Sequence, residues 1–234
     1  MSAKELLDRY VAVWNEPAPA VRRTAVAALW TLDGLHHTQT RRFQGTEDLV
    51  ARVTEAHDQF VVGQGLRFRA GGEPVGHHGA LAFNWVMTPG DSENVLAVGF
   101  DVVLLDADGR ITTDYQFNEP PAADAGLDAQ ADRYLAAVAA GGEALRKEVA
   151  DLYLPGAVLG DENGVHKGVE AVAAALEAGG SRHRTGSASA QHDAFRHSWR
   201  AESGETGVDL LLRDTQGLVR AHYRFPEAGG LGLA

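Results

Sequence analysis

The sequence predicts two tandem domains of the α+β class, each with helices packed on an antiparallel sheet. Two observations lead to this prediction: the second half of the 234-residue chain repeats the first, and in each half a helical pattern precedes a strand pattern. The clearest match aligns FDVVLLDADGRITTDYQF, from Phe100, with VDLLLRDTQGLVRAHYRF, from Val208, without a gap. We therefore expect one domain in residues 1–120 and a shorter one in residues 127–234.

Weaker matches follow the same order along the chain. The tripeptide DRY at residues 8–10 recurs at 132–134, and Trp85 recurs as Trp199. The spacing between matches shrinks in the second copy, which is why we expect the second domain to be shorter. The segment PPAADAG, from Pro120, is poor in large apolar residues and predicts the linker.

The first domain opens with apolar residues at helical spacing and changes to a strand pattern after residue 65. Glycine, proline and aspartate clusters separate the strands. We expect helices over about residues 3–15 and 18–29, a short strand over 35–40, a third helix from residue 45, and strands over 66–69, 78–88, 93–105 and 110–118.

The second copy repeats this plan in fewer residues. We expect helices over about residues 128–140, 143–153 and 169–178, a strand near Val158, and further strands between about residues 187 and 225.

The composition argues against several classes of function. A net charge of −11 argues against nucleic-acid binding, because affinity for phosphates comes mainly from clustered Lys and Arg. The absence of cysteine rules out disulfides, thiolate metal sites and a cysteine nucleophile. The histidines lack the spacing typical of zinc ligands, and no phosphate loop or GxSxG motif is present. We therefore expect no metal and no cofactor.

The N-terminal sixteen residues, MSAKELLDRYVAVWNE, are charged throughout, and no stretch has the apolar length that a bilayer requires. We expect a cytoplasmic protein that does not bind membranes.

Polar side chains share one face of the last strand predicted in the first domain. Alternation places Asp114 and Gln116 together, and an even-numbered hairpin loop pairs Asp101 with one of them on the same face. Two carboxylates in one partly apolar cavity acquire different pKa values, which provides one acid and one base. We expect Asp114 and Asp101 to be catalytic and Gln116 to orient the substrate. The alternative for Asp101 is a structural role, because it recurs as Asp209.

Two adjacent histidines, His36 and His37, lie on the short strand before the third helix. Because side chains alternate, one of them points inward, and a histidine oriented by a carboxylate is a common general base. We expect one of them to partner Asp114. The alternative is one surface histidine and one histidine hydrogen-bonded in the core.

Aromatic residues and one amide are candidates for substrate binding. Trp14, Trp30 and Trp85 offer large apolar surfaces to a planar ligand, and Asn84 offers an amide donor if its face of the strand is concave. Core packing is the alternative for the tryptophans, especially for Trp85, which recurs as Trp199.

The second domain cannot perform the same chemistry, because His222 takes the place of Asp114. Alternation groups Arg220, His222 and Arg224, which suits an anion, an interface or a solvated edge. We expect this domain to act mainly as a scaffold.

Helices followed by a meander, with a DxxG turn before a final aromatic strand, resemble the nuclear transport factor 2-like superfamily and, within it, the SnoaL-like group. The similarity lies in ALWTLDGLHH at residues 28–37, FQG at 43–45 and residues 100–117. It implies cone-shaped, cystatin-like α+β barrels in which helices close over a strongly curved sheet and leave one deep pocket per domain. It also implies an intrachain pseudo-dimer packed through the sheets, and it allows a further homodimer.

The superfamily includes cyclases, isomerases, dehydratases, epoxide hydrolases and domains without catalysis, so the resemblance does not select an activity. The pair Asp114-Tyr115 resembles the acid-aromatic pair of limonene epoxide hydrolases. Their arginine and aspartate on an earlier strand have no counterpart in residues 81–86, which argues against epoxide hydrolysis.

We expect a cofactor-independent acid/base enzyme of the isomerase, cyclase or dehydratase type, acting in the first domain on a small, apolar, polyketide-like or steroid-like molecule. The alternative is a non-catalytic module that binds a small molecule or supports assembly. A dedicated protein-interaction partner is a third class, and it would show a large exposed apolar patch.

Overall fold

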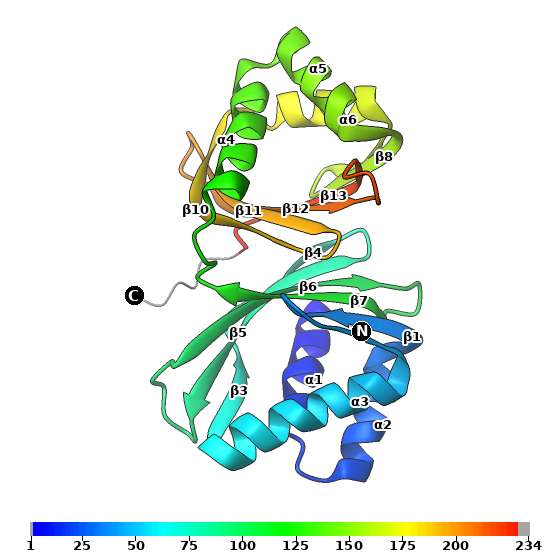
Figure 1. The fold of residues 1–234 in the computed structure, drawn as a ribbon, viewed down its shortest axis with the longest axis vertical. Coiled ribbons are helices and arrows are strands. Elements are labelled where there is room, and N and C mark those ends of the chain that lie inside the picture. Colours follow the sequence, from blue (N-terminus) through cyan, green and yellow to red (C-terminus); the bar gives the residue numbers. More distant parts are fainter. Residues whose placement is uncertain (1, 229–234) are drawn as a thin grey trace. The chain divides into compact units, whose positions relative to one another are not determined.

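The computed structural model describes residues 2–228 and divides the chain into two compact units, one ending at Glu119 and the next beginning at Pro120. Residues 229–234 of the second predicted domain lie outside the described residues. In each unit, α-helices cover one face of a single sheet (Figure 1). The predicted α+β fold is confirmed.

The helices of the first unit begin where the local sequence favours it. Helix α1 starts with a capping box, in which the Ser2 side chain accepts from the Glu5 backbone N–H and Glu5 accepts from the Ser2 N–H. Helix α2 starts with Pro19 at its first position, where no N–H is needed. The bounds are α1 Ala3–Asn15, α2 Pro19–Leu29, α3 Gly45–Ala56 and the π-helix η1 His57–Val62.

The first sheet has the strand order β2-β1-β7-β6-β5-β3, with β4 paired to β5. We predicted an antiparallel sheet, but β1 and β7 are parallel, so the sheet is mixed. Parallel neighbours need a long crossover, and here the connection between them includes most of the unit. The bounds are β1 Trp30–His37, β2 Arg42–Gln44, β3 Leu66–Ala70, β4 Val75–His77, β5 Ala80–Pro89, β6 Ala97–Leu105 and β7 Ile111–Glu119.

Strand β1 begins at Trp30, directly after α2, rather than at residue 35 as predicted. The Asp33-Gly34 pair suggested a turn, but it lies within the strand, where the register with β7 shifts between Trp30 and Leu35. The missing side chain at Gly34 leaves room for Trp30, because a Cβ there would lie 3.1 Å from the Trp30 Cβ. The strand therefore bends without ending.

The second unit repeats this arrangement, with the strand order β10-β11-β12-β13-β8-β9 and a parallel pairing of β13 with β8. Helix α4 begins at an Asp124 cap, whose side chain accepts from the backbone N–H groups of Gly126 and Leu127. The bounds are α4 Ala125–Ala140, α5 Gly142–Leu152, β8 Tyr153–Asp161, β9 Gly164–Lys167, α6 Val169–Ala178, β10 Arg182–Gln191, β11 Ala194–Ala201, β12 Thr206–Arg213 and β13 Val219–Pro226.

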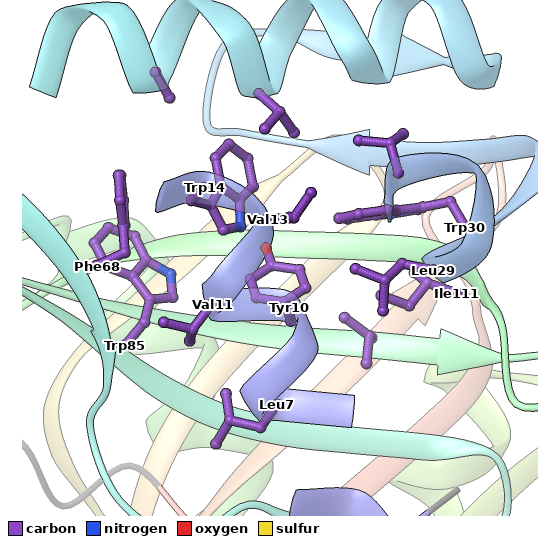
Figure 2. Packing of buried hydrophobic residues seen from close by; sticks show 14 of the residues in the cluster. Leu7, Tyr10, Val11, Val13, Trp14, Leu29, Trp30, Phe68, Trp85 and Ile111 are labelled. Carbon is purple, nitrogen blue, oxygen red and sulfur yellow. The ribbon is translucent and has the colours of Figure 1, made fainter. Parts of the chain in front are cut away.

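Aromatic rings from α1 and the sheet form the core of the first unit. Tyr10 lies between Trp14 and Trp30 (Figure 2), with ring centroids 5.9 and 5.6 Å away, and it meets the edge of Phe83 at 5.0 Å. All four side chains are buried. The Tyr10 hydroxyl is therefore held in an apolar setting, where a polar group needs a hydrogen-bond partner.

A glycine in each copy makes room for the repeated tryptophan. A Cβ on Gly99 would lie 2.1 Å from the Trp85 ring, and one on Gly207 would lie 2.4 Å from the Trp199 ring. These glycines occupy equivalent positions, two residues before Asp101 and Asp209. Close packing of the indole on the neighbouring strand thus requires glycine in both units.

Replacing Gly99 by Ala is expected to lower the free energy of unfolding by about 1–3 kcal/mol, because overpacking displaces Trp85 from the core. Urea unfolding followed by near-ultraviolet circular dichroism would measure both effects. Gly156→Ala is the control, since nothing lies within 4 Å of a Cβ at that position. An unchanged Gly99→Ala protein would contradict this account of the glycine.

No helix among residues 2–228 combines the length and apolar character needed to cross a membrane.

Candidate functional site

The first unit brings together four buried polar side chains, Tyr10, His36, Asp101 and Asp114, which we call the buried quartet. They come from α1, β1, β6 and β7. The strand register places His36 opposite Asp114, so alternation turns both toward the helices. Tyr10 reaches them from α1.

Short hydrogen-bonding distances connect the quartet. The Tyr10 hydroxyl lies 2.5 Å from Asp101 Oδ2 and 2.8 Å from Asp114 Oδ2. His36 Nδ1 lies 2.8 Å from the same Asp114 oxygen. The indole N–H of Trp85 donates to Asp101 Oδ1 at 3.0 Å. A continuous chain of hydrogen bonds therefore runs from Trp85 to His36.

The Tyr10 hydroxyl has one hydrogen, so it can donate to only one of the two carboxyl groups. The other contact requires a protonated carboxyl that donates to the hydroxyl oxygen. Burial, followed by the charge of Asp114, raises the pKa of Asp101 well above its usual range, which assigns the proton to Asp101. Asp101 then donates to Tyr10, Tyr10 donates to Asp114, and the His36 Nδ1–H donates to Asp114.

Burial also raises the pKa of the Tyr10 hydroxyl well above its usual range, with the two carboxyl groups adding to the effect. Tyr10 therefore stays protonated and acts as a bridge between the acids. The arrangement separates two like carboxyl groups into a neutral acid, Asp101, and a hydrogen-bond acceptor, Asp114.

Two atoms of the quartet are buried without a hydrogen-bond partner among the described residues, Asp114 Oδ1 and His36 Nε2. A buried polar atom without a partner calls for an explanation, which can be a functional role, local strain or a bound water molecule. His36 Nε2 is the ring nitrogen opposite the one that contacts Asp114. The pair therefore presents a free imidazole nitrogen that a carboxylate orients from behind.

Two cavities lie beside the quartet, with volumes of about 360 and 300 Å³. The larger one has an aromatic wall of Trp14, Phe60, Phe68 and Trp85. The smaller one has a polar lining that includes Arg41 and Glu55. They share Arg52, Phe60, Gln116 and Asn118, and we refer to them together as the cavity pair. Their volumes suit a small molecule.

The quartet is not part of the lining of either cavity. Tyr10 borders a narrow space with Trp14, Phe68, Trp85 and Gln116 that is too small for a water molecule. One aromatic ring separates His36 from each cavity. The His36 ring centroid lies 5.8 Å from that of Trp14, which lines the larger cavity, and 6.0 Å from that of Phe43, which lines the smaller one.

The structure brings together most of the residues expected at the site. Asp114, Asp101 and His36 belong to the quartet, and Trp14, Trp85 and Gln116 line the larger cavity. Asp101 pairs across the hairpin with Gln116, the second of the two partners that alternation allowed.

Three expected residues lie elsewhere. His37 stacks on Tyr115 at 5.1 Å, because alternation turns it to the opposite face from His36. Asn84 lies on the other face of β5 from Trp85 and donates to the Gly99 carbonyl at 3.1 Å. Trp30 is buried against Tyr10 in the core. None of the three is in the lining of the cavity pair.

Sequence patterns did not identify Tyr10 or Arg52 as residues of the site. Tyr10 is the bridge of the quartet, and its recurrence as Tyr134 in the DRY match was the available signal. Arg52 lies on α3, where polar and apolar residues follow the pattern of an ordinary amphipathic helix, so this pattern does not distinguish Arg52 from other surface residues. Only the folded arrangement shows that its side chain enters the cavity pair.

The equivalent position in the second unit has a different charge pattern. Asp209 accepts from Trp199 at 2.8 Å, as Asp101 accepts from Trp85. Arg224, at the position of Gln116, donates to both Asp209 oxygens at 3.2 Å. His222 Nε2 lies 3.0 Å from Asp209 Oδ2. An ion pair therefore replaces the pair of acids.

These contacts reverse the direction of the pKa shift. Burial alone raises the pKa of Asp209, but Arg224 and His222 outweigh it and hold the pKa well below its usual range. Burial lowers the pKa of His222, and it lowers that of His197 to about 4. At neutral pH the second unit thus has an ionised aspartate, whereas the first has a protonated one.

No group of three or more His, Asp or Glu side chains suited to a metal ion occurs among residues 2–228.

No protein-family model matches the chain, and no curated protein matches it. Among solved structures, a suggested isomerase of the SnoaL-like family from Agrobacterium tumefaciens is 28% identical, with a TM-score of 0.46, over 50% of this chain and 97% of its own. A nuclear transport factor 2-like protein with a cystatin-like fold from Novosphingobium aromaticivorans is 17% identical, with a TM-score of 0.40, over 51% of this chain and 80% of its own. A suggested polyketide cyclase from Sinorhizobium meliloti is 10% identical, with a TM-score of 0.38, over 50% and 99%. The chain is similar to SnoaL-like and nuclear transport factor 2-like proteins, each of which matches about half of it.

Proposed function

We propose that the first unit is a cofactor-independent acid/base enzyme of the isomerase, cyclase or dehydratase type that acts on a small, largely apolar molecule of polyketide-like or steroid-like structure. The observation that supports it is the pairing of Asp114 with His36 in a dry interior, with His36 Nε2 left unpaired. A buried histidine oriented by a carboxylate is suited to removing a proton next to a carbonyl group.

In this proposal, His36 Nε2 takes the proton and Asp114 stabilises the resulting imidazolium through the Nδ1–H bond. The proton then returns from Nε2 to another atom of the substrate, so no external acid is consumed. Asp101 and Tyr10 hold Asp114 in place by hydrogen bonds. Gln116, in the lining of the cavity pair, orients the substrate.

Substrate access in this proposal depends on an aromatic side chain that separates the quartet from the cavity pair. Trp14 contacts both Tyr10 and His36 and lines the larger cavity. Its rotation on ligand binding would connect the two. Closure around the ligand would then exclude water from the reacting atoms.

Asp114→Asn is expected to slow proton removal by about 10²–10⁴-fold, because an amide neither stabilises the imidazolium nor keeps the hydrogen on Nδ1. The assay is hydrogen–deuterium exchange at the carbon next to the carbonyl of 2-tetralone, followed by proton NMR. His36→Gln should give the same loss. Asp91→Asn is the control, since that side chain is 97% exposed. Exchange by Asp114→Asn at the wild-type rate would contradict the proposal.

The rival function is a non-catalytic module that binds a small molecule or supports assembly. It is favoured by the separation between the quartet and the cavity pair, since neither Asp114 nor His36 lines a cavity. Tight binding of a ligand without any exchange activity would support this second function.

The second unit is proposed to be mainly a scaffold. Leu159 is opposite His222 there, so the counterpart of His36 is absent, and Asp209 is held in an ion pair. The domain limits, the intrachain pseudo-dimer, a further homodimer and a cytoplasmic location remain predictions from the sequence.

A further inference from the structure

Arg52 of α3 is the one cationic side chain shared by both cavities of the pair. It lies where the aromatic wall of the larger cavity meets the polar lining of the smaller one. Its guanidinium carbon is 5.2 Å from the Trp14 ring centroid and 5.8 Å from that of Phe43. The rings fix the position of the charge.

The hydrogen bonds of Arg52 leave part of its donor capacity unused. Its Nη2 donates to Gln116 Oε1 at 3.3 Å, whereas its Nε is buried without a partner. A guanidinium has five N–H donors in a planar fork, which matches the two oxygens of a carboxylate.

No carboxylate among the described residues pairs with this cation. Glu55, the acid of the smaller cavity, is bonded to Arg41 at 2.9 Å. Glu119 is the acid that lines the larger cavity, and it lies on the same strand as Gln116. Burial lowers the pKa of Arg52 by more than the nearby acidic groups, among them Tyr10 and Glu55, raise it.

We propose that the ligand of the cavity pair is a flat apolar molecule with a carboxylate group, and that Arg52 binds this carboxylate. The aromatic wall of the larger cavity supplies contacts for the flat part of the ligand. The planar guanidinium of Arg52 lies at the edge of that wall. The anion neutralises the half-buried cation and accepts hydrogen bonds from its guanidinium.

This inference rests on the proposed function in one respect, since it concerns the ligand of the same site. Gln116 is the connection, because it accepts from Arg52 and also borders the narrow space beside Tyr10. A carboxylate held at Arg52 would therefore leave the apolar part of the ligand facing Trp14, behind which His36 lies.

The test compares two probes of equal shape, 2-naphthoate and 2-naphthamide, by isothermal titration calorimetry at pH 7. Wild-type protein is expected to bind the carboxylate at least about tenfold more tightly, as a charge-assisted hydrogen bond permits. Arg52→Met should remove this preference, and Arg52→Lys, which keeps the charge but not the fork, should reduce it about threefold or more. Arg67→Met, which removes an exposed arginine of the same unit, should leave it unchanged.

Equal affinity of wild-type protein for both probes would overturn the inference, as would a preference that persists in Arg52→Met. Circular dichroism would establish that Arg52→Met is folded, and Arg52→Lys decides the question if it is not. Because the assay measures binding alone, its result is independent of turnover. The enzyme proposal fails separately, through the Asp114→Asn exchange assay.

Discussion

Asp209→Asn is expected to lower the free energy of unfolding by about 3–5 kcal/mol at pH 7. The substitution removes the carboxylate that accepts from the Arg224 guanidinium through both of its oxygens, and Arg224 is 2% exposed. A buried charge that loses its partner is far more costly than the pair itself is stabilising. Urea unfolding followed by circular dichroism would measure the change.

The pH dependence of Asp209 follows from its lowered pKa. Its folded pKa lies below the unfolded value near 3.8, so its contribution to stability is present above pH 3.8 and declines as the pH falls toward the folded pKa. The variant should lack this decline. Asp193→Asn, which breaks the half-exposed pair with Arg220, is the control and should cost less than about 1 kcal/mol. Equal losses in the two variants would contradict the role of Asp209.

Asp101→Asn is expected to raise the free energy of unfolding at pH 7, an effect opposite in sign to that of Asp209→Asn. The amide oxygen can still accept from Trp85, and the amide N–H₂ can donate to Tyr10 in place of the acid hydrogen. The variant therefore keeps both hydrogen bonds without having to take up a proton. Wild-type protein has to bind that proton from a neutral solution.

The raised pKa of Asp101 fixes the sign of the pH effect. The folded state holds the proton more tightly, so the contribution to stability is full below pH 3.8 and is lost as the pH rises toward the folded pKa. The loss is about 1.4 kcal/mol per pH unit within that window. The advantage of Asp101→Asn over wild type should grow with pH, as urea unfolding between pH 4 and 8 would show. A constant difference would mean that Asp101 is ionised in the folded protein.

The contrast between Asp101 and Asp209 shows a limit of sequence reasoning. The two residues align without a gap, and both accept from a tryptophan of the neighbouring strand. Their protonation differs because Gln116 in one copy is Arg224 in the other. The alignment of the two copies shows this difference, but it does not show how the difference changes the pKa of the aspartate. A pKa depends on the neighbours in space, and these include a tyrosine more than 90 residues away.

Sequence periodicity predicted the features that depend on residues close together in the chain. Helical spacing gave the three α-helices of each unit to within a few residues among the described residues, and alternation separated His36 from His37 once a partner strand was known. The pairing of β1 with β7 could not be predicted in this way, since no periodicity reports which distant strand lies alongside. That pairing is what places His36 against Asp114.

The parallel pairing of β1 with β7 also determines when the site can form during synthesis. His36 leaves the ribosome 78 residues before Asp114, and Tyr10 leaves 104 residues before it. Until β7 emerges, β1 has no strand that connects it to β6, and the sheet remains in two parts. Contacts of such long sequence separation form slowly, so the nascent first unit exposes β1 and β6 while translation proceeds toward Glu119. A ribosome-stalled chain that ends before residue 111 should therefore remain protease-sensitive, and release of the complete unit should protect it.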